Sequence, residues 1–581
     1  MKRIIACCGL LFISCGTIRA SEIKDINQAV ESAPAAQESS KKDQASLNKE
    51  LADLLKPVTR QNVLDLLGAG ADPNAVNEDG RPVILGAVYN GSTELVRLLI
   101  ERGASLNAQN KKGWTALFVA VRMGHFDIVK MLLALAHYDL NAFGNEIGCS
   151  VLHLACATGH ADIVNLLLGC PAIDVNLPSA IGTSPLHYAV GQNGVDIVNM
   201  LLAHPNIGVN LSDKDGFTPL NLACYRGHTQ IVRQLLHCPG IDVNARNNDG
   251  FIPLHWAALR GDAEIVGMLL SHQETNVNLP NKRGHSPLFN AVSQNQVDTV
   301  RLLLAHPEIA VNAASEAGET PLLIAAFAGH SDLVEILLGR PDIDVNFQST
   351  SGASPLMIAA RESGRKPGCV KIVSLLLAHP HIAINLPDKN GYTPLNAALS
   401  SGHIDVVNML LSHSEIDVNY PVHFPLLVKA GGYSPLHIAV DRNSFALVNL
   451  LLAFTTIDVN RATDRGITPL INAAERGNEE IVASLLLKEG VEVNACCEEG
   501  LTALHKAAAR GHFEVVQKLV SRGADALLLS KESKTAENLA QEAGHAEIAQ
   551  YLRRVREKDN EDTAMQALAE LAAQSSLPHG T

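Results

Sequence analysis

Short apolar segments with helical spacing alternate with polar loops along most of the chain. Residues 163–168, Ile-Val-Asn-Leu-Leu-Leu, show the pattern, because their apolar side chains recur with the 3.6-residue period that places them on one face of an α-helix. A shorter apolar segment precedes such a helix, a polar loop follows it, and the arrangement returns many times. This self-similarity predicts a stack of helical repeats instead of the roughly three or four globular domains that the length alone would suggest.

Glycines mark the period of the repeat. Each ends a polar loop and is followed two residues later by Thr-Pro-Leu-His or a near relative, as at 184–187 and 502–505. Glycine suits a turn with positive φ, the hydroxyl caps the next helix, and proline fits the first helical turn because its missing N–H would have no partner there. The thirteen glycines, mostly 34 residues apart, are Gly80, Gly113, Gly148, Gly182, Gly216, Gly250, Gly284, Gly318, Gly352, Gly391, Gly432, Gly466 and Gly500.

The rest of each unit follows one plan. The first helix runs to a second glycine, often Gly-His as at 159–160, where the chain reverses. The second helix carries Ile-Val-x-x-Leu-Leu and leads to Val-Asn, as at 175–176, before the next loop. Together these motifs resemble the ankyrin repeat over about residues 60–555. The resemblance implies an all-α repeat solenoid of ankyrin helix-turn-helix units with β-hairpin-like finger loops.

Composition and repeat phase divide the chain into successive segments. Solenoids need caps because interior repeats expose apolar faces at both ends. A short helix at 563–573 is expected inside the tail. The predicted order is a signal peptide at 1–20, a flexible linker at 21–48, an N-terminal capping half-repeat at 49–79, ankyrin repeats at 80–390 and at 391–532, a C-terminal cap at 533–555 and a polar tail at 556–581.

Two spacings exceed 34 residues by five or more. Between Gly352 and Gly391 the spacing is 39, and the extra residues fall at 362–369, between the two helices of that unit. Between Gly391 and Gly432 it is 41, and the extra residues fall in the finger loop at 420–430. Lengthening a surface loop costs little free energy, so neutral loop drift explains both insertions. The alternative is that the apolar finger at 420–430 forms a binding element or a joint between two sub-stacks.

The first twenty residues have the features of a secretory signal. A basic start at 1–3 is followed by an apolar stretch at 4–13 and by a small-residue cleavage site after Ala20. This predicts export to a periplasm, a cell surface or the medium, and no other apolar run is long enough to predict a transmembrane segment. The alternatives are a short buried helix and a lipid anchor at Cys15. By analogy with ankyrin proteins of intracellular bacteria and parasites, a host cytoplasm is a further destination.

The charge of the chain and the positions of its cysteines each exclude one class of interaction. A formal charge of −14, a pI near 5.9 and the lack of a dense Lys/Arg stripe argue against nucleic acid as a partner.

Eight cysteines follow Ala20. Cys156 and Cys224 hold equivalent positions two repeats apart, so they should lie about 20 Å from each other at 8 to 10 Å per packed layer. A disulfide needs Cα atoms within about 7 Å. Unpaired thiols are therefore expected, with only Cys496 and Cys497 exposed enough to react.

Histidines are the main candidates for acid–base or metal chemistry, but eighteen of the 23 recur in three repeat phases. The sequence also lacks zinc-ligand spacing, a phosphate-binding loop, a dinucleotide fingerprint and a nucleophile elbow. No catalytic residue, metal, cofactor or small-molecule substrate is therefore predicted. The resemblance implies that the Leu-His and Gly-His side chains hydrogen-bond backbone between repeats. These are His153, His187, His255, His437, His505, His160, His228, His330, His403 and His512.

With catalytic and metal sites not predicted, the functional feature expected of this chain is a protein-binding surface. In ankyrin proteins, partners usually lie along the concave side, against finger tips, the residue after the finger glycine and the end of the first helix. Five aromatic residues follow the finger glycine in a chain that is 4% aromatic, and aromatic and Arg side chains dominate interface energies. The alternative is that they merely cover adjacent helix ends. The partner-binding residues so predicted are Lys112, Trp114, Lys214, Phe217, Tyr225, Arg226, Phe251, Arg260, Tyr392, Tyr433 and, in the irregular finger, Phe424.

These features predict a non-enzymatic scaffold that binds a protein partner along the concave ankyrin surface. One alternative is an inhibitor or stabilising subunit of an exported enzyme, with the finger at 420–430 reaching into a cleft. Another is a secreted effector that acts on host proteins. An enzyme would need a catalytic set assembled across repeats, for which the motifs are missing.

Overall fold

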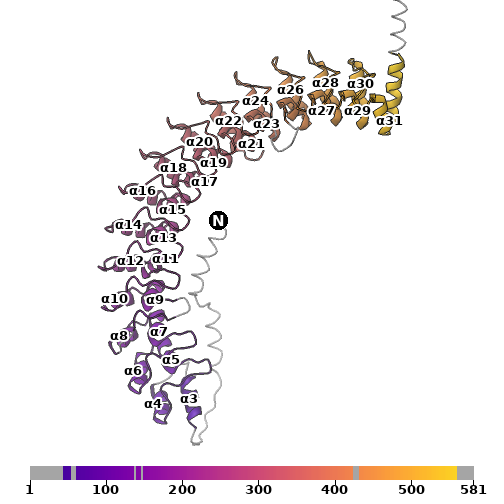
Figure 1. Ribbon diagram of the computed structural model, residues 1–581. Helices are drawn as coiled ribbons and strands as arrows, with labels where there is room; N and C mark the ends of the chain where they lie inside the picture. The colour runs from indigo at the N-terminus through magenta and orange to yellow at the C-terminus, as the bar shows by residue number, and fades with distance from the viewer. Residues whose placement is uncertain (1–42, 54–59, 136–138, 145–147, 423–430, 559–581) are drawn as a thin grey trace, which may run out of the picture. The chain divides into compact units, whose positions relative to one another are not determined.

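The computed structural model describes residues 43–53, 60–135, 139–144, 148–422 and 431–558 (Figure 1). The predicted signal peptide at 1–20, Cys15, most of the linker at 21–48, Phe424 and the tail helix at 563–573 lie outside these residues. The chain forms two compact units, Met1–His137 (unit 1) and Tyr138–Thr581 (unit 2).

Unit 1 is built from helix pairs. In each pair the two helices contact one another, and α5 also packs against α7 of the next pair. The helices are α3 (Gln44–Ala52), α4 (Arg60–Gly68), α5 (Val83–Tyr89), α6 (Thr93–Glu101), α7 (Ala116–Met123) and α8 (Phe126–Leu135).

The first helix, α3, begins inside the segment predicted to be a linker. The side chain of Asp43 caps it by accepting a hydrogen bond from the N–H of Ser46 at 2.8 Å. Leu47 and Leu51 are buried. The helix therefore begins before residue 48, where the linker was predicted to end. Burial of these two leucines stabilises a helix that carries none of the repeat motifs.

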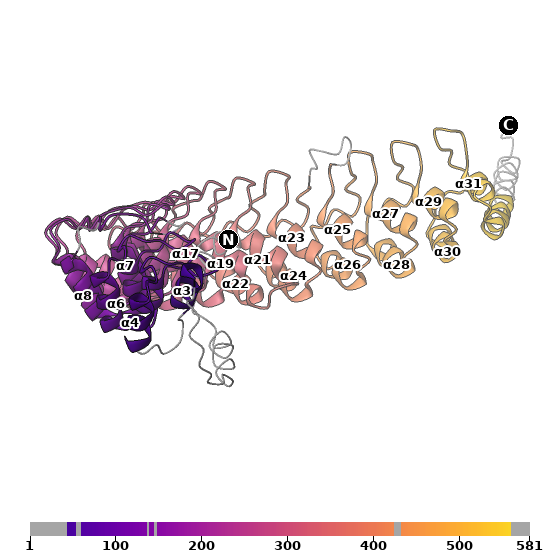
Figure 2. The same cartoon turned by 90° about the horizontal axis from the view of Figure 1, so that it is seen from below.

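Unit 2 stacks helix pairs in two rows. The odd-numbered helices are the first of each pair, and each contacts the next odd-numbered helix, as α13 contacts α15 and α15 contacts α17. Within unit 2 this row lies on the inner side of the curve (Figure 1), and the finger loops around α25 to α31 project away from the helices (Figure 2). The side formed by the odd-numbered helices and the finger loops is called the inner face below. The first helices are α9 (Val151–Thr158), α11 (Pro185–Gly191), α13 (Pro219–Arg226), α15 (Pro253–Arg260), α17 (Pro287–Ser293), α19 (Pro321–Ala328), α21 (Pro355–Glu362), α23 (Pro394–Ser401), α25 (Pro435–Asp441), α27 (Pro469–Arg476), α29 (Ala503–Arg510) and α31 (Ala536–Glu542). The second helices are α10 (Ala161–Leu168), α12 (Val195–Leu202), α14 (Thr229–Leu236), α16 (Ala263–Leu270), α18 (Val297–Leu304), α20 (Ser331–Leu338), α22 (Gly368–Leu377), α24 (Ile404–Leu411), α26 (Phe445–Leu452), α28 (Glu479–Leu487) and α30 (Phe513–Ser521).

The local signals read from the sequence set these helix ends. At the start of α13, the hydroxyl oxygen of Thr218 accepts a hydrogen bond from the N–H of Asn221 at 3.3 Å, and Pro219 takes the first helical position. At its end, Gly227 has φ of +75°, a conformation that costs glycine little. In the second helices the Ile-Val-x-x-Leu-Leu side chains form the core, and in α10 Ile163 and Val164 are fully buried.

The finger loops are tight turns, and β-structure is sparse in them. In the part of the chain that the structure describes, it consists of isolated antiparallel bridges in three loops. They join Val76 to Pro82, Val422 to Tyr433 and Cys496 to Thr502.

A ladder of asparagine side chains ties each loop to the next. The Val-Asn residue Asn176 donates its amide N–H to the carbonyl of Asn206 at 2.6 Å, while its amide oxygen accepts from the N–H of Gly208 at 2.7 Å. Asn244 makes the same pair of bonds, to Glu274 and Asn276. Each rung satisfies a backbone donor and a backbone acceptor that would otherwise depend on solvent. In unit 2 the ladder consists of Asn141, Asn176, Asn210, Asn244, Asn278, Asn312, Asn346, Asn385, Asn419, Asn460 and Asn494.

A further helical segment follows α31 at the C-terminal end of the array. It covers residues 546–558 and so continues past the predicted end of the cap at 555. The carboxylate of Glu537, only 10% exposed, lies 3.0 Å from Arg553 Nε and 2.8 Å from Arg556 Nη1. These ion pairs, together with buried Leu552, hold the helix against α31.

Candidate functional site

An aromatic cluster lies on the inner face of unit 2, over α13 and α15. The ring of Trp256 stacks between Phe217 and Phe251, with centroids 5.4 and 4.6 Å away, and Tyr225 meets it edge-on at 5.0 Å. Phe217 and Phe251 follow finger glycines, whereas Tyr225 and Trp256 come from the helices. Offset stacking and edge-on contact are the favourable geometries for aromatic pairs. These four residues are called the aromatic cluster below.

The structure thus brings together three of the predicted aromatic residues and adds one. Trp256 was missed because the prediction followed the residue after the finger glycine, and Trp256 follows the Leu-His motif inside the helix. The sequence does contain a signal for Trp256, because this residue directly follows the Leu-His motif of a first helix. Phe217 is only 7% exposed, so its ring supports the cluster and offers little surface to a partner.

Charged side chains flank the aromatic cluster. The Arg226 guanidinium lies 5.8 Å from the centroid of the Tyr225 ring. Arg260 is exposed, pairs with Asp262 at 2.6 Å and donates to the carbonyl of Tyr225 at 3.5 Å. Lys214, at a finger tip, is exposed. The cluster is therefore bordered by side chains that suit a polar interface rim.

The other predicted residues lie elsewhere. In unit 1, Trp114 has the Arg122 guanidinium 4.8 Å and the Lys112 ammonium 5.7 Å from its ring. In unit 2, burial raises the pKa of the Tyr392 and Tyr433 hydroxyls, and the Tyr433 ring contacts His437 at 5.3 Å.

The Leu-His side chains join neighbouring repeats. His187 Nε2 donates to the carbonyl of Phe217 at 2.9 Å, and its Nδ1 accepts from the N–H of Ser184 at 3.2 Å. His437 does the same with Ile467 and Ser434. Burial lowers the pKa of both histidines to about 4. The predicted backbone role of the Leu-His residues is confirmed.

Of the Gly-His side chains predicted to bond between repeats, His512 reaches back to the preceding repeat, as His125 also does. Their acceptor is a carbonyl near the end of the first helix, which has no acceptor role inside that helix. In repeats without a histidine at this position, another side chain donates to the equivalent carbonyl of the preceding repeat. The pairs are His125 with Tyr89, His512 with Glu475, Arg260 with Tyr225, Gln296 with Leu259 and Lys366 with Phe327.

The comparison with protein families agrees with this geometry. A model of ankyrin repeats in three copies matches residues 58–144, 134–213, 205–281, 254–349, 341–421, 436–530 and 478–564. The chain belongs to the ankyrin-repeat family. A search among curated proteins finds no match. Ankyrin repeats are generally protein–protein interaction modules.

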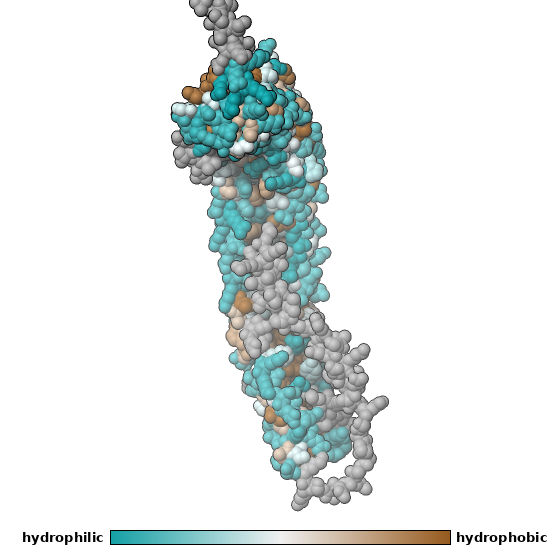
Figure 3. Space-filling model, turned by 90° about the vertical axis from the view of Figure 1, so that its right-hand side faces the viewer, coloured by the Kyte–Doolittle hydropathy of each residue, from teal (hydrophilic) through white to brown (hydrophobic). Residues whose placement is uncertain are grey.

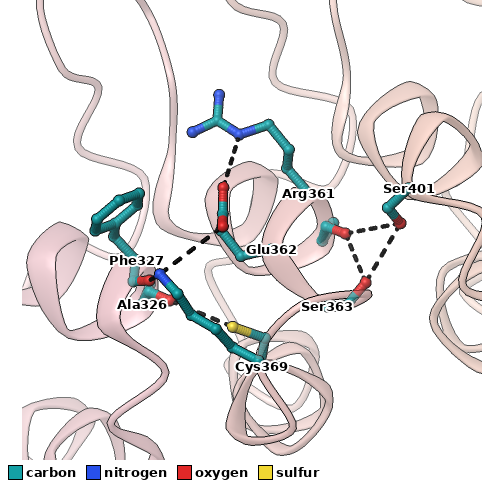
Figure 4. A network of polar contacts seen from close by, with 9 residues as sticks. Ala326, Phe327, Arg361, Glu362, Ser363, Cys369 and Ser401 are labelled. Atoms are coloured by element: carbon teal, nitrogen blue, oxygen red, sulfur yellow. Dashed lines mark hydrogen bonds and ion pairs between the residues drawn. The ribbon is translucent and has the colours of Figure 1, made fainter.

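The insertion at 362–369 of this ankyrin array packs against both neighbouring repeats (Figure 4). Besides its bond to the Phe327 carbonyl, the Lys366 ammonium lies 3.9 Å from the centroid of the Phe327 ring and 3.8 Å from the Glu362 carboxylate. Glu362 is 8% exposed and also lies 3.4 Å from Arg361 Nε. On the other side, the Ser363 hydroxyl lies 3.4 Å from that of Ser401. The inserted residues therefore continue the contacts between repeats.

None of the eight cysteines that the structure describes forms a disulfide, as expected. Cys496 is exposed, but Cys497 is 7% exposed, so the prediction that both are accessible is wrong for Cys497. The side chain of Cys497 is buried, although its neighbour in the loop is exposed. Burial raises the pKa of Cys156 and Cys224 strongly.

Metal-ligand clusters and membrane-spanning helices can be sought among the described residues. Among them, no group of three or more His, Cys, Asp or Glu side chains is placed to hold a metal ion. No described helix has the length and apolar composition needed to cross a bilayer. On the face shown in Figure 3, hydrophobic residues form small patches among hydrophilic ones.

Proposed function

We propose that this chain is a non-enzymatic scaffold that binds a protein partner on the inner face of unit 2, centred on the aromatic cluster. The observation that carries the proposal is the stack of Phe217, Trp256 and Phe251 with Tyr225 at its edge. A rigid aromatic platform loses little conformational entropy on binding, and aromatic residues with arginine dominate binding energies at interfaces. The basic start and apolar stretch of the first twenty residues support a further part of the proposal, that the chain acts after export.

The exposed edge of the cluster provides the test. Partners captured by the full chain are identified by mass spectrometry, and the dissociation constant of each is measured by calorimetry. The double variant Tyr225→Ala with Arg260→Ala should weaken a partner that uses this face by about tenfold or more, because each truncation at an interface centre costs upwards of about 1 kcal/mol.

The matched control is Arg233→Ala. Arg233 is also an exposed arginine, but it lies on the second helix α14 and pairs with Glu264 at 2.8 Å. This variant should bind as the parent chain does. A double variant that keeps its helical circular dichroism and its full affinity would remove the cluster from the binding surface.

A further inference from the structure

A cavity of about 300 Å³ lies on the inner face near the C-terminal end of the array. It is bounded by the first helices α27, α29 and α31 and by the finger loops that precede α29 and α31 (Figure 2). Leu501, Ala509 and Leu539 form an apolar wall and are only half-buried. Glu499 and Glu532, one from each finger loop, form an acidic edge. An apolar wall with a few polar groups is the composition of pockets that take a ligand.

The acidic edge of the cavity is open to solvent. The side chain of Glu499 is 70% exposed and that of Glu532 is 77% exposed. The two finger loops are joined directly, because the N–H of Lys531 donates to the carbonyl of Glu499 at 3.0 Å. The two carboxylates therefore belong to neighbouring backbone segments and line one cavity. A single group with several donors has access to both.

One cation of the chain already lies in this cavity. The Lys506 ammonium is 3.8 Å from the Glu499 carboxylate and 3.9 Å from that of Glu475, so both contacts are longer than hydrogen bonds. Glu475 has a closer partner in Arg510, at 2.7 Å. Lys506 therefore lies between two carboxylates without being held tightly by either.

Lysine is exceptional at this place in the repeat. The fold does not require a cation there, whereas the carboxylates of Glu475 and Glu499 attract one. The cavity is therefore a place where positive charge is favoured. In most other repeats of unit 2 the residue after the Leu-His position is apolar, namely Leu154, Tyr188, Leu222, Trp256, Ile324, Ile358, Ala397 and Ile438.

The cavity keeps an excess of negative charge. Lys534 is shared between two carboxylates, at 3.1 Å from Glu532 and 2.8 Å from Glu542. Four carboxylates against three cations leave one negative charge, in a chain whose formal charge is −14. Electrostatic complementarity therefore favours a cationic ligand. The ionic side chains of the cavity and their direct partners are Glu475, Glu499, Glu532, Glu542, Lys506, Arg510 and Lys534.

We infer that this cavity binds an arginine side chain of a protein partner. The planar guanidinium carries five N–H donors and bonds to the carboxylates of Glu499 and Glu532 together, whereas the lysine ammonium is a compact point charge. The aliphatic part of the arginine side chain packs on the apolar wall at Leu501 and Leu539. This site is a second one on the inner face, because it lies on α27 to α31 and shares no residue with the aromatic cluster.

Synthetic peptides test the chemistry of the ligand. A fluorescein-labelled peptide with one arginine among leucine, serine and glycine residues is compared with peptides that carry citrulline, lysine or glutamate at that place. Citrulline has the shape of arginine without its charge. Fluorescence polarisation with the full chain should show that the arginine peptide binds about tenfold more tightly than the citrulline peptide, and high salt should weaken it. Binding of any of the other three peptides as tight as that of the arginine peptide would overturn the inference.

Two substitutions in the cavity should change the affinity for the arginine peptide in opposite directions. Glu499→Gln removes an acidic partner of the guanidinium and should weaken binding about fivefold. Lys506→Gln removes the cation that competes for Glu499 and should strengthen binding about threefold. The matched control Glu514→Gln removes the same charge from the exposed side of α30 and should leave the affinity unchanged.

Circular dichroism checks that each variant keeps its helices. Weaker binding by a folded Lys506→Gln variant, or an equal loss in Glu499→Gln and Glu514→Gln, would also overturn the inference. The double variant Tyr225→Ala with Arg260→Ala should bind the arginine peptide as the parent chain does, so that the two proposals fail separately.

Discussion

His187 shows how a single buried side chain joins two repeats. Its Nδ1 atom accepts from the Ser184 N–H, and its Nε2 atom donates to the Phe217 carbonyl, so the ring must be neutral with its proton on Nε2. A second proton would place a donor opposite the backbone N–H and a charge in an apolar environment. His153, His255 and His437 have the same position in their repeats, and burial lowers the pKa of each to about 4.

We expect the stability of the array to fall between pH 6.5 and pH 4. In this range the unfolded histidines, with a pKa near 6.5, bind protons that the folded ones, with a pKa of about 4, do not. Stability is therefore complete above pH 6.5 and decreases as the pH falls, by at most roughly 3 kcal/mol for each histidine. Denaturant unfolding, followed by circular dichroism at pH 7, 6 and 5, measures the decrease.

The chain contains a natural template for the control. Asn221 occupies the Leu-His position in its own repeat and donates its amide N–H to the Ala245 carbonyl at 2.9 Å. The variant His187→Asn should therefore fold and should show a smaller loss of stability between pH 7 and pH 5 than the parent chain. An identical pH dependence in both proteins would contradict this role for His187.

Single residues differ in how far the sequence alone reveals them. The Leu-His histidines were predictable because they recur in one repeat phase, and the resemblance to ankyrin repeats implies their bonds to the backbone. Trp256 was not singled out, since its importance arises only when Phe217 of the preceding repeat stacks on it. The burial of Phe217 and Cys497 was missed for a related reason, because a loop residue turns inward or outward according to its neighbours.

Among the helices, α22 begins at a place that admits only glycine. A Cβ atom on Gly368 would stand 2.1 Å from the carbonyl oxygen of Gly329, which is backbone and cannot move aside. Gly267 lies inside α16, and a Cβ atom there would meet nothing within 4 Å. Gly368 is therefore closely packed against backbone, whereas Gly267 faces open space.

The two alanine substitutions should therefore change stability in opposite directions. Gly368→Ala should lower the free energy of unfolding by about 1–3 kcal/mol, as is typical of overpacking. Gly267→Ala should raise it by up to about 1 kcal/mol, because alanine favours the helix and meets no obstacle. Denaturant midpoints measure both changes in stability. A gain in stability for Gly368→Ala would show that the backbone at Gly329 moves aside, contrary to the structure.

At the scale of elements, the helices with motifs were predicted and those without were not. The hydroxyl, proline and glycine signals act locally, and so they locate the ends of α13 and its equivalents. α3 and residues 546–558 depend on burial against a neighbour, as with Leu47 or the ion pairs of Glu537. The replacement of the Gly-His donor by Lys366 also depends on the path of an inserted loop, which no pattern in the sequence specifies.

For the whole molecule, the free thiols have a chemical consequence. Among the eight cysteines that the structure describes, iodoacetamide at pH 8 should modify Cys496 first, because it is exposed, whereas burial raises the pKa of Cys170 and Cys238. Peptide mapping by mass spectrometry identifies the site, and Cys496→Ser should abolish the fast modification among these eight thiols. A reducing agent should leave the unfolding midpoint unchanged. A lower midpoint under reduction would show that disulfides form between cysteines that the structure keeps apart.

The asparagine ladder has a consequence for how this molecule can change over evolution. Asn176 bonds to a carbonyl 30 residues onward, Asn346 to one 35 residues onward across the first insertion, and Asn419 to one 37 residues onward across the second. The rungs match in geometry although the chain between them differs in length. Alignment of the repeats is thus set by where the rungs meet and is independent of residue count. New loops can therefore be inserted between rungs, and new binding sites can arise on them, while the remaining repeats stay in place.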